Sequence, residues 1–137
     1  MGYTHYWTLT RDMTDDEIGT IAEDVRAIVA ASGVPVAGPL GTGEPEYGPD
    51  EIALNGAEPD DYETFGLSRY KGWTFCKTGE RPYDVVVTAA LLAAKDRLGD
   101  GIRLSSDGEP ADWHDGRMLV AKALGRIVPP VTFDEAE

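Results

Sequence analysis

The segment from Pro82 to Gly99 constrains the fold most, because its central part is apolar on nearly every side. Proline suits the first helical position, Asp84 falls in the first turn, and Gly99 follows two basic residues, so the segment has the ends of a helix. Residues 85–94 leave almost no polar surface for contact with water. We therefore predict a buried central helix, which other elements must cover.

Two amphipathic helices are predicted before and after this central helix. In the first, Thr14 and Glu17 form a capping box, apolar residues recur at helical spacing, and Gly33 is a natural end. The second covers roughly residues 110–124, with Gly125 as its end. Each presents one apolar stripe, which is typical of a helix that lies at the surface of a core.

Strands are predicted from alternation and from turn residues. The opening YTHYWTLT alternates, so that one face of a strand carries Tyr3, His5, Trp7 and Leu9. Shorter strands are expected within residues 34–37, 51–56, 63–70, 72–78 and 101–106. Because several short strands separate the first two helices, we predict an α+β fold. It has a small mixed or antiparallel sheet and about three helices, packed mainly on one side.

Composition limits the organisation and the location of the protein. The 137 residues suit a single domain, which we place at residues 1–125, followed by an extended acidic C-terminal tail at residues 126–137. We expect a cytoplasmic protein without a signal peptide or a contact with membranes, because no run of 18 apolar residues occurs. The single cysteine, Cys76, excludes an intrachain disulfide and is expected to be a small buried residue.

The formal net charge of −13 argues against binding to a nucleic acid duplex, which needs a basic surface. The charge is uneven along the chain. Residues 1–70 hold 14 acidic and 3 basic side chains, whereas residues 71–137 hold 11 and 9. The second half can therefore hold a local positive pocket.

Such a pocket is predicted at FCKTGERPYD, residues 75–84. Lys77 and Arg81 precede the predicted start of the central helix, whose free amides and positive dipole end favour an anion. Thr78 adds a hydroxyl group. The alternative is structural, with Arg81 paired to a carboxylate such as that of Asp84 or Asp107. The sequence leaves both interpretations open.

A second polar group, SSDG, ends a predicted strand just before the last helix. Its residues either form a turn that satisfies its own backbone or face the basic corner and share a polar ligand such as a nucleotide. Most aromatic residues should lie in the core, and the alternative for Tyr83 and Trp113, which flank these corners, is to stack on a base. The candidate ligand-binding residues are Lys77, Thr78, Arg81, Tyr83, Asp84, Ser105, Ser106, Asp107, Trp113 and His5.

Catalytic and metal chemistry find less support in the sequence. His5 is expected to be packed or hydrogen-bonded, and His114 to be exposed at a helix start. A nucleophilic pair of Cys76 and His5 would require the two to be close in space. We predict no metal site and no cofactor, because no ligand spacing typical of metal sites occurs.

Three motifs resemble those of a known group of proteins. GYTHYW, FCKTGERPYD and IRLSSDG are similar to segments of small proteins from tailed bacteriophages and prophages, over residues 2–124 of this chain. The resemblance implies a phage or prophage origin and a shared fold. It implies no reaction.

Three functions are consistent with these sequence features. The first is a non-catalytic accessory protein that binds an anionic small molecule at the start of the central helix. The second is an acidic module that binds a host protein or joins the virion, since acidic surfaces attract basic partners. The third is a small hydrolase-type enzyme that uses Asp107, Cys76 or His5.

Overall fold

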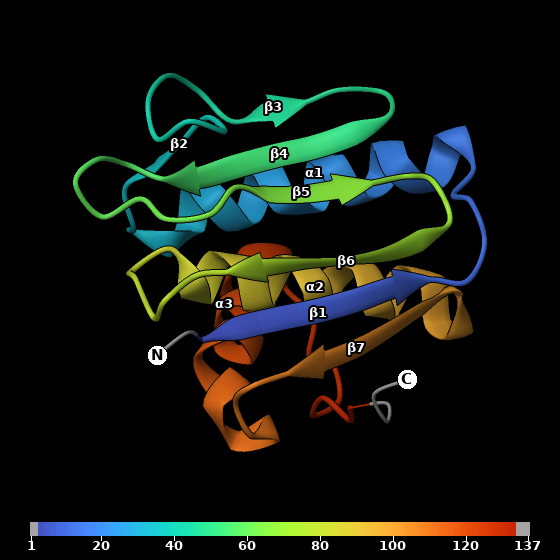
Figure 1. Ribbon diagram of the computed structural model, residues 1–137. Helices are drawn as coiled ribbons and strands as arrows, with labels where there is room; N and C mark the ends of the chain where they lie inside the picture. The colour runs from blue at the N-terminus through green and yellow to red at the C-terminus, as the bar shows by residue number, and fades with distance from the viewer. Residues whose placement is uncertain (1–2, 134–137) are drawn as a thin grey trace.

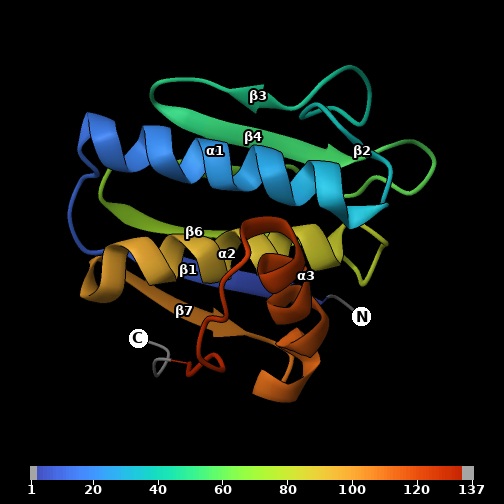
Figure 2. The ribbon, with the colours of Figure 1, turned by 180° about the vertical axis from the view of Figure 1, so that it is seen from behind.

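The computed structural model describes residues 3–133. Its strands form one layer, and all three α-helices lie behind that layer (Figures 1 and 2). The elements follow in the order β1 (Thr4–Leu9), α1 (Asp15–Ser32), β2 (Val36–Ala37), β3 (Glu46–Tyr47), β4 (Glu51–Gly56), β5 (Phe65–Ser68), β6 (Gly72–Lys77), α2 (Asp84–Leu98), η1 (Gly99–Gly101), β7 (Ile102–Ser106), η2 (Pro110–Trp113) and α3 (His114–Leu124).

The strand layer consists of two antiparallel sheets. One has the order β6-β1-β7, and in the other β4 pairs with β2, β3 and β5. Strand β5 lies beside β6, so that the two sheets continue one another across the molecule (Figure 1). The predicted α+β class, with helices on one side of the strands, is confirmed.

Helix α2 is the centre of the molecule, as predicted. It connects β6 to β7, which lie on either side of β1, and it packs against both α1 and α3. Ten of its residues are buried, from Val86 to Ala94 and again at Leu98. Helix α1 has the predicted capping box between Thr14 and Glu17, and Gly33 ends it in the left-handed conformation.

The helix starts are less regular than the sequence predicts. Helix α2 begins at Asp84 and not at Pro82, because a turn comes first, in which the Asp84 amide donates to the Arg81 carbonyl. Residues 110–113 form a 3₁₀ turn before α3, where Glu109 and Asp112 make a reciprocal capping box.

The segment after α3 is extended, and it also packs on the domain. Val128 and Val131 are buried, and the Phe133 ring meets the Trp113 ring edge-on at 5.4 Å. The acidic residues that end the predicted tail, 134–137, lie outside the described residues. Among residues 3–133, no helix combines the length and the apolar composition needed to cross a bilayer.

Candidate functional site

The two polar motifs predicted from the sequence meet at the start of β1. The amides of Thr78 and Gly79 donate to the Tyr3 carbonyl, and the Asp107 amide donates to the Thr4 carbonyl. Strand β1 therefore lies between the FCKTGERPYD turn and the SSDG turn. We call this region the polar corner, made of residues 3–5, 77–84 and 105–108.

His5 is at the centre of the polar corner and is fully buried. Its Nε2 lies 2.7 Å from Asp84 Oδ1, and its Nδ1 lies 2.8 Å from Ser106 Oγ. Thr78 Oγ1 donates to the same Asp84 oxygen at 2.5 Å. The cluster thus joins β1, β7 and the turn before α2 to the first residue of that helix.

Two aromatic rings enclose the imidazole. Tyr3 and Trp113 each meet His5 edge-on, with ring centroids 5.1 and 5.0 Å away. Burial, together with the carboxylates of Asp84, Asp112 and Glu80, raises the pKa of Tyr3 to about 12. The electrostatic environment at Tyr3 is therefore negative, which disfavours an anion beside it.

Ser106, His5 and Asp84 form the same chain of contacts as a catalytic triad, but the surroundings differ from those of an active site. Ser106 Oγ already accepts a hydrogen bond from the Gly108 amide at 2.9 Å. His5 has no exposed surface through which a substrate could reach it. A structural role explains both observations, because each ring nitrogen of the buried imidazole has a hydrogen-bonding partner.

The geometry does not support the alternative of a nucleophilic pair of Cys76 and His5. The two residues are cross-strand neighbours, but the Cys76 thiol lies 3.5 Å from the Glu63 carbonyl and forms no hydrogen bond with His5. Burial raises the pKa of Cys76 to about 12, so the thiol stays protonated at neutral pH and is a poor nucleophile. Within residues 3–133, no group of three potential ligand side chains is placed to hold a metal ion.

The two predicted cations belong to different elements, since Lys77 lies in β6 and Arg81 in the turn before α2. Arg81 is exposed, and its guanidinium lies 5.2 Å from the centre of the Tyr62 ring, while Lys77 ends β6. Neither forms an ion pair in the described part of the chain, so the expected pairing of Arg81 with Asp84 or Asp107 is wrong. Asp84 binds His5 and Thr78 instead.

The amides that were expected to face a ligand are largely occupied. Those of Val86 and Val87 donate to the Tyr83 carbonyl, in addition to the Asp84 bond described above. Tyr83 is fully buried, with its hydroxyl donating to the Glu63 carbonyl, and Trp113 is 1% exposed. The expectation that Tyr83 or Trp113 stacks on a base is therefore wrong for this conformation.

A different feature, which the sequence interpretation missed, lies on the face of the strand layer opposite the helices. Trp73 is 61% and Phe75 is 45% exposed, and both project from β6 beside Tyr6 of β1. The Trp73 ring is stacked with Tyr6 at 6.2 Å and tilted against Phe75 at 5.3 Å. We call these three residues the outer aromatic cluster. No described element covers it (Figure 1).

One carboxylate borders the outer aromatic cluster. Asp107 is exposed and accepts a hydrogen bond from the Tyr6 hydroxyl at 3.1 Å, while its other oxygen accepts from the Thr4 amide. No ion pair involving Asp107 occurs among residues 3–133. The alternation Trp73-Thr74-Phe75-Cys76 contained the signal for this surface, because it places two aromatic residues on one face of a strand.

Comparison with known proteins finds no matching family model, no matching curated protein and no matching solved structure.

Proposed function

We propose that the protein is a non-catalytic interaction module, which docks a positively charged protein on the outer aromatic cluster. The observation that carries the proposal is the exposure of Trp73 and Phe75 on a sheet face that no described element covers. Exposed Trp and Tyr are the residues that most often dominate binding energy at protein interfaces. Their burial by a partner would remove a large apolar area from water.

The charge of the chain supports a basic partner over a second copy of the same chain. At a net charge of −13, two copies repel one another, and so do the protein and any polyanion. A basic protein is attracted, and its arginine side chains can stack on aromatic rings while they pair with a carboxylate such as that of Asp107. The resemblance to bacteriophage proteins makes a host protein in the cytoplasm the proposed source of the partner.

The proposal is tested by capture of partners from bacterial lysate with three forms of the chain. These are the wild type, the double variant Trp73→Ser/Phe75→Ser, and the control Leu40→Ser. Leu40 is 83% exposed in a loop away from the cluster. A protein that the wild type and the control capture, and the double variant loses, supports the proposal. Equal capture by all three forms contradicts it.

Fluorescence of the purified complex then locates the contact. Trp73 is the exposed tryptophan, whereas Trp7 and Trp113 are 2% and 1% exposed. A docked partner should shift the emission of Trp73 to shorter wavelength and protect it from acrylamide. Rising salt should slow association, because charge attraction between exposed groups is screened. Emission that does not change on binding would place the contact elsewhere.

Binding of an anionic small molecule remains a second candidate function, supported by two observations. Residues 77–84 and 105–107 flank the start of β1 at the polar corner, and Lys77 and Arg81 form no ion pair within residues 3–133. The occupied helix amides and the acidic surroundings of Tyr3 rank it below protein docking. A thermal-shift panel of nucleotides tests it, since saturating ligand stabilises the folded state. No shift with any nucleotide at millimolar concentration would reject it.

A further inference from the structure

The segment that follows α3 lies along a furrow on the helical side of the molecule. Figure 2 shows this segment leaving α3 and passing across α2. We call residues 126–133 the strap. Two hollows of about 160 and 240 Å³ adjoin it, and both are lined by Leu92, Pro130 and Val131. The strap therefore fills only part of the furrow.

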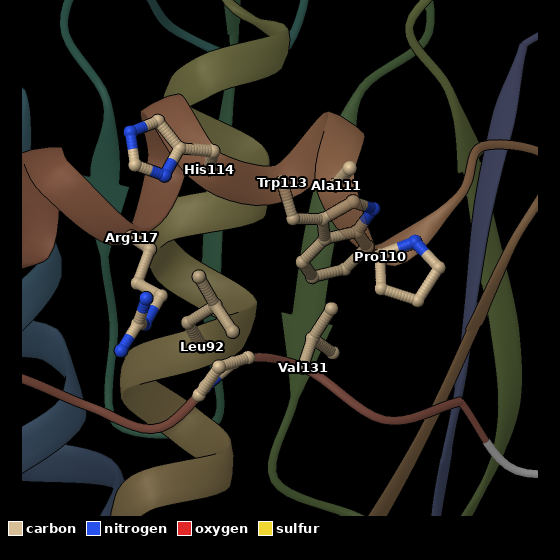
Figure 3. A pocket seen from close by; sticks show the side chains of 8 residues that line it. Leu92, Pro110, Ala111, Trp113, His114, Arg117 and Val131 are labelled. Carbon is tan, nitrogen blue, oxygen red and sulfur yellow. The ribbon is translucent and has the colours of Figure 1, made fainter.

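The furrow has an aromatic and aliphatic lining with one exposed polar end (Figure 3). Its walls come from α2, η2 and α3, and the side chains are Leu92, Pro110, Ala111, Trp113, His114 and Arg117. The Trp113 ring makes edge-on contacts with the His5 ring in the core and with the Phe133 ring of the strap. The floor of the furrow is thus fixed by the buried core.

The strap is bound without a backbone ladder. Within residues 3–133, no backbone–backbone hydrogen bond ties the strap to the rest of the chain. It is held instead by side chains. Val128 and Val131 are buried, and Arg117 Nε donates a hydrogen bond of 2.6 Å to the Val128 carbonyl. At its start, Arg126 forms ion pairs with Asp96 at 2.9 Å and with Asp24 at 3.4 Å. Pro129 and Pro130 have no amide to donate, and they restrict the residues before them to extended conformations.

These contacts match the way in which extended proline-containing peptides bind to proteins. Such peptides lie in aromatic-lined grooves, place every third side chain on the same face, as Val128 and Val131 are here, and lose little conformational entropy, because proline fixes their backbone in advance. We propose that the furrow is a recognition groove for an extended segment with two prolines between aliphatic residues, and that the strap occupies it as an internal ligand. A partner with a segment of this kind must displace the strap.

The strap has a strong advantage over a partner, because a short linker after α3 tethers it at millimolar or higher effective concentration. A segment from another protein can bind only those molecules in which the strap has left the furrow. Its apparent affinity is therefore the intrinsic affinity multiplied by the fraction of such molecules. This competition makes the strap a built-in inhibitor of the groove. Weakening the strap without altering the furrow should uncover binding.

The test uses the full chain and a fluorescent peptide with the strap sequence RIVPPVTF. In Val131→Asp, the charged side chain should be expelled from the furrow, since an isolated buried carboxylate is strongly unfavourable. The matched control is Ile127→Asp, four residues earlier, where the side chain is 78% exposed. By fluorescence anisotropy, we expect the peptide to bind Val131→Asp at least about tenfold more tightly than the wild type or the control.

Three outcomes would overturn the proposal. The first is that the peptide does not bind Val131→Asp although circular dichroism shows a folded chain. The second is that the peptide binds all three forms of the chain equally. The third is that a peptide with serine in place of both of its valines binds as tightly as the original peptide. If Val131→Asp does not fold, Val128→Ser replaces it as a milder change to the strap. The same three outcomes, measured with Val128→Ser, would then overturn the proposal. This groove is separate from the outer aromatic cluster, so each proposal can fail alone.

Discussion

The two faces of the strand layer differ although they are built from adjacent residues. In β1, His5 points toward the helices and is fully buried, while its neighbour Tyr6 points to the other side. In β6, Cys76 is fully buried and Phe75 is 45% exposed. Side chains of successive strand residues point to opposite faces, so a shift of one position changes the environment completely.

Side chains on the inner face are buried with partners, whereas the aromatic side chains on the outer face are exposed to water. On the inner face, even the polar side chains of His5 and Asp84 have partners at hydrogen-bonding distance. On the outer face, Trp73 and Phe75 remain in contact with water. A fold gains no stability from such exposure, so the comparison indicates that these residues serve a contact outside the chain.

The largest predicted difference between the faces concerns two tryptophans on adjacent strands. Trp7→Ala removes a fully packed inner side chain and should lower the free energy of unfolding by about 3–5 kcal/mol. Trp73→Ala removes an exposed ring and should change it by less than about 1 kcal/mol. Urea titrations followed by circular dichroism measure both. Similar losses for the two variants would mean that the outer face is covered.

The next difference concerns two aspartates of the polar corner. Asp84→Ala leaves the His5 ring and the Thr78 hydroxyl without their shared acceptor, so we expect a loss of about 1–3 kcal/mol. Asp107→Ala removes an exposed carboxylate, whose partners are the Tyr6 hydroxyl and the Thr4 amide, and should cost less than about 1 kcal/mol. The same urea titrations decide the order. A reversed order would show that His5 and Asp84 contribute little to stability.

Alkaline pH should weaken the inner face. Cys76 loses its proton near pH 9.0 in the unfolded chain, but its pKa in the folded chain is about 12. The unfolded state therefore binds fewer protons above pH 9, so this contribution to stability is complete below that pH and disappears as pH rises toward 12. For Cys76 alone, the slope should approach about 1 kcal/mol per pH unit. Unfolding measured at about pH 8 and about pH 10.5 tests this, and Cys76→Ala should reduce the slope.

The smallest predicted effect on stability is that of Trp73→Phe, which should nevertheless change the tryptophan fluorescence clearly. Trp73→Phe should leave the free energy of unfolding nearly unchanged and remove most of the tryptophan emission that acrylamide quenches. Trp7→Phe is the matched control, because Trp7 is 2% exposed and should already be protected. Quenching that is the same in Trp73→Phe and the wild type would show that self-association protects the outer aromatic cluster.

Local patterns predicted the elements well. The capping box of Thr14 and Glu17 and the end of α1 at Gly33 occur as expected. The alternation of residues 3–9 also assigned His5 and Trp7 to the same buried face. These features depend on residues within one turn or one strand, so the sequence contains the information directly.

The candidate site was predicted less well, because its contacts join distant parts of the chain. The sequence grouped Asp84 with Lys77 and Arg81, but the nearest partner of its carboxylate is Thr78, followed by His5, which lies 79 positions away. The general expectation that aromatic residues lie in the core failed for Trp73 and Phe75. Which face of β6 the helices cover depends on the whole layer and cannot be read from β6 alone.

The amino-acid sequence by itself determined the three helices, the strands other than β3 and the inward face of β1, because hydrophobic periodicity and capping act over a few residues. Only the tertiary structure decided that β1 lies between β6 and β7, and this placement unites His5, Asp84 and Ser106. It also placed Tyr6 beside Trp73 and left both facing outward. The physical reason is that all three helices cover the same side of the strands, so burial on one face leaves the other open.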